Sequence, residues 1–160
     1  MKKLSAGILL FRHGESELEV FLVHPGGPFW AKKDAGAWSI PKGEYTDTKD
    51  ALTTAKREFK EETGVGVDGK FLSLGTLKQP SGKVVTAWAL EQDLDPSALK
   101  SNTFALEWPP RSGRIRNFPE VDRGGWFSLP AAQDKMLKGQ LEFLKRLADY
   151  LSANHGDLPI

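Results

Sequence analysis

One segment, Asp50 to Thr63, constrains the chain most because a single predicted helix carries two opposed faces. Apolar residues recur there every three or four positions, the period of an α-helix packed against a core. They are Ala51, Leu52, Ala55 and Phe59. Asp50 or Thr48 suits the N-terminal cap, and Gly64 suits the C-terminal cap. The segment therefore predicts an amphipathic helix whose apolar face another layer must cover.

The opposite face of this helix carries three carboxylates. Glu58, Glu61 and Glu62 lie at positions i, i+3 and i+4, which share one side of a helix. Their mutual repulsion costs about 0.2–0.5 kcal/mol per pair when exposed. A divalent cation would turn this repulsion into attraction, and oxygen ligands suit Mg²⁺ or Mn²⁺. The alternative is a solvated acidic face that Lys56 or Lys60 balances.

The wider segment from Gly43 to Val65 resembles the Nudix box. That pattern is Gly, five residues, Glu, seven residues, then Arg-Glu-apolar-x-Glu-Glu-x-Gly-apolar. Eight of its nine specified positions match here, namely Gly43, Arg57, Glu58, Phe59, Glu61, Glu62, Gly64 and Val65. Lys49 stands where the family has its first Glu, which largely supports the loop and pairs with the box Arg. Asp47 or Asp50 is the candidate to compensate.

The rest of the chain predicts an α/β (α+β) fold, a mixed β-sheet between α-helices, as the resemblance also implies. We expect a single Nudix-type domain over residues 1–152 and a loose C-terminal tail over 153–160. Strands are predicted at 6–12, 19–24, 38–40, within 65–74, and at 84–90, 103–108 and 125–129. Loops are predicted at 29–36 and 109–119, and further helices at 130–137 and 140–152.

Composition excludes several functional classes. The 160 residues include no Cys, which rules out disulfides, thiolate metal sites and cysteine nucleophiles. The net charge of +1 supplies no general attraction for nucleic acid or anionic membranes, so nucleic acid is an unlikely partner. No apolar run approaches the ~20 residues that span a bilayer. We expect a soluble, cytoplasmic protein without membrane contact, and the sequence leaves its oligomeric state open.

The resemblance implies a metal-dependent hydrolase of a pyrophosphate bond in a nucleotide-like small molecule. Glu58, Glu61 and Glu62 would bind Mg²⁺ or Mn²⁺ together with the carbonyl oxygen of Lys42. Arg57 would orient the box carboxylates. The general base would be a box glutamate, with Glu61 the catalytic candidate, or a later glutamate, for which Glu120 is preferred to Glu107. A dinucleoside polyphosphate such as diadenosine tetraphosphate, or a nucleoside triphosphate, is the favoured substrate.

Substrate contacts are predicted from residue chemistry. Lys42 and Arg111 are the preferred phosphate donors, and Trp30 the preferred platform for a base. Weaker candidates are Lys32, Lys33, Arg114 and Arg116 for phosphate and Phe29, Trp88, Trp108 and Phe118 for stacking. His24 is read as structural rather than as a phosphate contact. Two other functions stay open: a Nudix-fold binding or regulatory module without useful turnover, and an RNA-end pyrophosphohydrolase.

Overall fold

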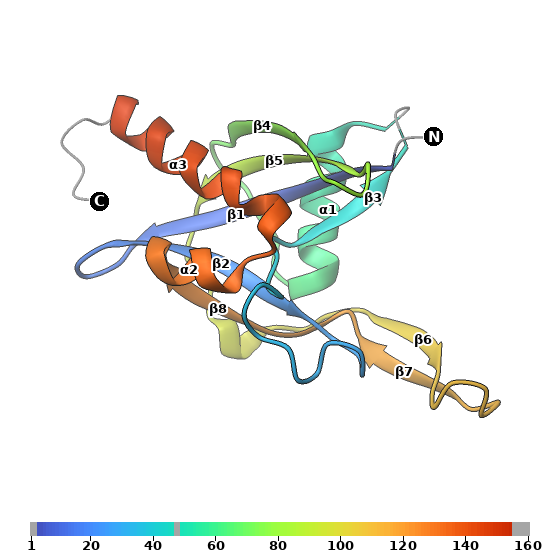
Figure 1. Ribbon diagram of the computed structural model, residues 1–160. Helices are drawn as coiled ribbons and strands as arrows, with labels where there is room; N and C mark the ends of the chain where they lie inside the picture. The colour runs from blue at the N-terminus through green and yellow to red at the C-terminus, as the bar shows by residue number, and fades with distance from the viewer. Residues whose placement is uncertain (1–2, 47–48, 155–160) are drawn as a thin grey trace.

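A mixed six-stranded sheet forms the centre of the computed structural model, which describes residues 3–46 and 49–154 (Figure 1). The strand order is β4-β5-β1-β2-β8, and β3 pairs with β1 outside this path. The strands are β1 (Leu4–His13), β2 (Leu18–Pro25), β3 (Lys42–Tyr45), β4 (Leu72–Lys78), β5 (Val84–Glu91) and β8 (Val121–Ser128). β1 and β5 run parallel, whereas the other pairs in this sheet are antiparallel.

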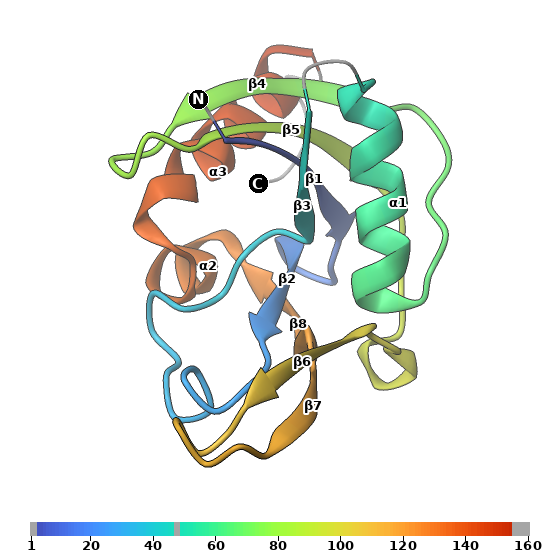
Figure 2. The same ribbon diagram turned by 90° about the vertical axis from the view of Figure 1, so that its right-hand side faces the viewer.

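Helices cover both faces of the sheet (Figure 2). α1 (Ala51–Thr63) lies on one face, and α2 (Leu129–Lys135) and α3 (Leu141–Asn154) lie on the other. Side chains of β1 alternate between the two layers. Ile8 and Leu10 join the cluster around Phe59 of α1, while Leu9 joins the cluster around Leu147 of α3. The predicted mixed sheet between helices is therefore confirmed.

α1 begins and ends where its sequence indicates. The side chain of Asp50 accepts a hydrogen bond from the backbone N–H of Thr53, which makes Asp50 the N-cap. Thr48, the other predicted cap, lies outside the described residues. Gly64 ends the helix with φ of 80°, a left-handed conformation that glycine adopts without steric cost. Ala55 and Phe59 are fully buried beneath the helix, as the apolar period predicts.

A second, two-stranded sheet projects from the body of the molecule (Figure 1). It consists of β6 (Thr103–Glu107) and β7 (Ile115–Pro119), paired antiparallel. The prediction of a loop over 109–119 was therefore wrong for its second half. The segment Ile115–Pro119 carries little apolar alternation, and its strand geometry comes from hydrogen bonding to β6 rather than from burial.

Several predicted boundaries differ because tertiary contacts set them. Residues 38–40 make isolated bridges, Val23 to Ser39 and Trp38 to Met136, instead of a strand. β8 starts at Val121, earlier than predicted, because β2 pairs with it as far as Pro25.

Smaller differences concern the connecting segments. Residues 65–71 are not a strand, β3 was not predicted, and α2 ends at Lys135. Short 3₁₀ helices occupy Pro96–Ala98 and Lys138–Gln140.

No helix within 3–46 and 49–154 has the length and apolar character needed to cross a membrane. α3 continues to Asn154, and the rest of the predicted tail, residues 155–160, lies outside the described residues.

Candidate active site

The first and last parts of the Gly43–Val65 segment meet at Glu58. A Cβ atom added to Gly43 would lie 2.0 Å from Cδ of Glu58, closer than any real side chain could approach. The backbone of β3 therefore passes directly against this carboxyl group, and only glycine leaves room for it. This contact explains why a glycine fifteen residues before Glu58 belongs to the same site.

Arg57 pairs with the helix carboxylates. Its Nη2 lies 3.0 Å from Oε2 of Glu58, and its Nε lies 3.9 Å from Oε1 of Glu61. Asp50, a candidate to replace the missing first glutamate, is instead occupied as the helix cap. The other candidate, Asp47, lies outside the described residues. Lys49 is exposed, and its positive charge faces solvent beside the helix. As a cation, it cannot form an ion pair with Arg57.

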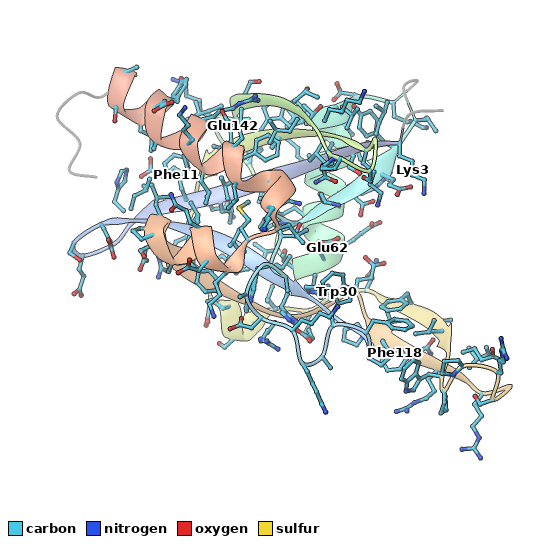
Figure 3. All side chains as sticks on the ribbon, viewed as in Figure 1. Lys3, Phe11, Trp30, Glu62, Phe118 and Glu142 are labelled. Carbon is cyan, nitrogen blue, oxygen red and sulfur yellow. The ribbon has the colours of Figure 1, made fainter. Side chains whose placement is uncertain are left out.

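A pocket of about 200 Å³ opens beside α1. Four predicted site residues from separate segments reach it: Trp30, Lys42, Glu62 and Glu120. Glu62 and Trp30 are neighbours in Figure 3. The remaining lining residues, which the sequence did not single out, are Val23, Pro25, Ala37, Ser39, Ile40, Val121 and Leu137.

The carboxyl groups at this pocket repel one another. Burial raises the pKa of Glu62 to about 8, with further contributions from the charges of Glu120 and Glu58, while Lys42 opposes the shift by its charge and a backbone hydrogen bond. Burial also raises the pKa of Glu120, and the charges of Glu58 and Glu61 add to this rise. Glu120 therefore faces the acidic ridge of α1, which consists of Glu58, Glu61 and Glu62, although 58 positions separate Glu120 from Glu62 in the sequence.

Two further groups complete the electrostatics. Burial raises the pKa of Glu58, against the hydrogen bond from Arg57. Burial lowers the pKa of Lys42, and the charge of Lys83 lowers it further. A partly buried group of carboxylates that repel one another is the kind of donor set that a divalent cation neutralises.

The carboxylate oxygens of this group are of the kind that a hard divalent cation prefers. Within 3–46 and 49–154, however, no three acidic or histidine side chains are drawn together as a ready-made metal cluster. The ion pairs of Arg57 engage two of the three helix glutamates, Glu58 and Glu61, and a cation would compete with that arginine.

Arg111 and Glu107 lie away from this pocket. Arg111 occupies the turn between β6 and β7 with φ of 61°, and it is not part of the pocket wall. The carboxylate of Glu107 accepts hydrogen bonds from the backbone N–H groups of Arg111 and Gly113, so Glu107 stabilises the turn. The structure thus brings Lys42 and Trp30 to the pocket with Glu62, but it does not bring Arg111 there.

His24 is fully buried, and both of its ring nitrogens are engaged. Nδ1 lies 2.9 Å from Oδ1 of Asp122, and Nε2 contacts the carbonyl oxygen of Lys33. These contacts tie the loop after β2 to β8, which agrees with a structural reading of His24. Lys33 in turn places its Nζ 5.1 Å from the centre of the Trp30 ring. No periodicity or motif in the sequence marks the long-range contact of His24 with Asp122.

The fold and this pocket define a class of protein: an α/β domain that presents an acidic helix to a small, charged cavity. The chain belongs to the Nudix family of pyrophosphohydrolases, because the family model described as NUDIX domain matches residues 1–147. A comparison with curated proteins found no match.

Solved structures share this fold at low sequence identity. The NUDIX domain of Shewanella oneidensis NrtR in complex with ADP ribose is 20% identical, with a TM-score of 0.66 over 94% of this chain and 89% of that one. A C. elegans Ap4A hydrolase binary complex is 19% identical, with a TM-score of 0.63 over 93% and 98%. A mutT/nudix family protein from Listeria innocua is 17% identical, with a TM-score of 0.62 over 95% of each chain.

Proposed function

We propose that this protein is a divalent-metal-dependent hydrolase that cleaves a pyrophosphate bond in a nucleoside diphosphate derivative. The observation that carries the proposal is the approach of Glu120 to the acidic ridge of α1 across one pocket. An acidic helix alone could be a solvated surface. Glu120 adds a fourth carboxyl group to this helix from a distant loop, and it is partly buried. A solvated acidic surface does not account for this placement, which suits proton transfer.

Each site residue then has a distinct task. Glu58, Glu61 and Glu62, with the carbonyl oxygen of Lys42, would hold Mg²⁺ or Mn²⁺, which supplies charge neutralisation and a more acidic attacking water. Arg57 orients Glu58 and Glu61 through its ion pairs. Glu120 accepts the proton of the attacking water, and Glu61 is the alternative base.

Lys42 and Trp30 are the proposed substrate contacts in the pocket. The ammonium group of Lys42 supplies a positive charge next to Glu62, where a phosphate would enter. The half-buried ring of Trp30 forms one wall and can pack against a base or sugar. Among substrates we favour a dinucleoside polyphosphate such as diadenosine tetraphosphate, followed by a nucleoside triphosphate.

A substrate panel tests the proposal. Purified protein is incubated with Mg²⁺ or Mn²⁺ and with diadenosine polyphosphates, nucleoside triphosphates, ADP-ribose or 5′-triphosphorylated RNA, and products are separated by chromatography. We expect metal-dependent cleavage of a dinucleoside polyphosphate, and loss of that cleavage to background in Glu61→Gln. Glu142→Gln, an exposed acid on α3, is the matched control and should retain full activity. Equal activity of Glu61→Gln and the wild type would refute the metal-site assignment.

A second candidate function rests on Lys49 and Arg57. Because Lys49 cannot pair with Arg57, that arginine pairs with two proposed metal ligands, Glu58 and Glu61. A protein in this state could bind nucleotides without useful turnover. Tight, metal-dependent nucleotide binding by calorimetry, combined with no cleavage across the panel, would favour this binding module over the hydrolase.

A further inference from the structure

The β6–β7 hairpin carries aromatic rings and arginines on the same face. We call residues 103–119 the arm. In its register Phe104 lies opposite Phe118, and Leu106 lies opposite Arg116, and such opposed residues share one face. Trp108 continues the alternation of β6, and its backbone N–H donates to the carbonyl of Arg114. The other face contains Thr103, Ala105, Glu107, Ile115, Asn117 and Pro119.

The base of the arm is hydrogen-bonded to the backbone of Glu61 and Glu120, two residues that carry proposed catalytic carboxylates. The backbone N–H of Asn102, just before β6, donates to the carbonyl of Glu61 on α1 at 2.8 Å. The backbone N–H of Glu120, just after β7, donates to the carbonyl of Asn102, also at 2.8 Å. The arm therefore starts beside the residues that carry the proposed catalytic groups. Five residues per strand carry it outward by about 16 Å.

Aromatic side chains continue from the pocket onto the arm. Trp30 lines the pocket, and its neighbour Phe29 is 61% exposed. The ring of Phe29 lies edge-on to Trp108, with centroids 5.3 Å apart. In the view of Figure 3, Trp30 lies between Glu62 of α1 and Phe118 of the arm.

The arm also has an excess of positive charge. It contains Arg111, Arg114 and Arg116 but only one acid, Glu107, whose carboxylate is already bound to two backbone N–H groups. Within the described part of the chain, none of these arginines has an ion-pair partner. The guanidinium of Arg116 lies 5.5 Å from the centre of the Phe118 ring. A surface with aromatic rings and unpaired arginines suits a ligand that is both anionic and flat.

We propose that the aromatic face of the arm, with Phe29, binds a second nucleotide of the substrate. This nucleotide would lie at the end of the polyphosphate chain that is away from Glu62. This inference rests on the proposed function and narrows it to substrates with two nucleosides. A base stacks against Phe29 and Trp108, and arginines of the arm contact the phosphates that lead to it. A nucleoside triphosphate lacks this second base and leaves the aromatic face unused.

The test measures binding, so it does not depend on turnover. Calorimetry with Mg²⁺ compares a methylene-bridged, non-hydrolysable diadenosine tetraphosphate with the corresponding ATP analogue. We expect Phe29→Ala to weaken the two-nucleoside analogue by about tenfold, which is within the range for loss of one base stack. Its effect on the ATP analogue should be less than about twofold, because that ligand stays within the pocket.

Two controls isolate the aromatic face. Ile115→Ala removes an apolar side chain that is 68% exposed on the opposite face of the arm, and it should change neither Kd. Arg116→Gln should weaken the two-nucleoside analogue, whereas Lys145→Gln on α3 should not. Equal weakening of both analogues by Phe29→Ala, or no weakening of either, would overturn the inference. A protein that binds both analogues normally but cleaves neither parent nucleotide would refute the hydrolase while leaving this inference intact.

Discussion

α1 and the arm are attached to the molecule in opposite ways. α1 lies along the sheet, with Ala55 and Phe59 fully buried, and both of its ends are capped. The arm has no fully buried side chain and is attached at its base and through the loop that carries Phe29. Proposed chemistry thus lies on the rigid element and proposed selectivity on the projecting one. This division separates the proposed determinants of substrate choice from the proposed metal ligands on α1.

The largest effect is expected where the two regions meet, at Glu120. Replacing Glu120 with Gln removes the proposed proton acceptor but keeps the size of the side chain. We expect the turnover number to fall by about 10²–10⁴-fold, the usual contribution of a general base. Steady-state kinetics on the best substrate measures the fall, with Glu142→Gln as control. A near-normal rate would move the base to the helix, to Glu61.

Stability should separate α1 from the arm. Phe59→Ala leaves a cavity under α1 and should lower the free energy of unfolding by about 3–5 kcal/mol. Replacing residues 108–114 by Asn-Gly should change it by less than about 1 kcal/mol, because all of these positions except Trp108 are exposed and exposed positions contribute little. Urea unfolding followed by circular dichroism measures both. Comparable losses would show that the arm is part of the folding core, contrary to the division drawn above.

Metal should stabilise the region around α1. At a Mg²⁺ or Mn²⁺ concentration of about 100 times Kd, binding to the native state adds about 2.7 kcal/mol. For a chain of this size the melting temperature should rise by about 5–10 °C. Glu62→Gln should remove most of this rise, and the shortened arm should keep it. A rise that survives Glu62→Gln would place the cation elsewhere.

The smallest effect concerns Lys49. Lys49→Glu would offer Arg57 another acid and release Glu58 and Glu61 from it. Exposed ion pairs contribute about 0.2–1 kcal/mol, so metal affinity should rise by at most about fivefold. Calorimetric titration with Mn²⁺ measures the change, and Lys49→Gln separates loss of the positive charge from gain of the negative one. Weaker metal binding by Lys49→Glu would contradict this account of Arg57.

The sequence predicted the local, periodic parts of the molecule well. α1, its caps at Asp50 and Gly64, the first two strands and the outer helices follow from spacing and composition alone. These elements are determined by residues close in the chain, so a reading along the chain is sufficient.

Long-range pairing was harder to predict. β7 has arginines where a buried strand has apolar residues, and its pairing with β6 defines it. Arg111 was expected at the phosphates because arginine suits them, but its place in the turn of the arm separates it from the pocket. The contact of His24 with Asp122 joins segments 98 positions apart, and no local pattern announces it.

The sheet topology also bears on how the chain is made. β1 and β2 emerge together and pair, but β1 gains its parallel neighbour only with β5, and β2 gains β8 only when residues 121–128 exist. At synthesis rates of about 5–20 residues per second, the free edge of β2 waits roughly 5–20 s. During this interval two strongly apolar strands have unpaired backbone groups, which favours association with other nascent chains. We therefore expect the yield of folded protein to depend on the pace of synthesis as well as on the stability of the finished domain.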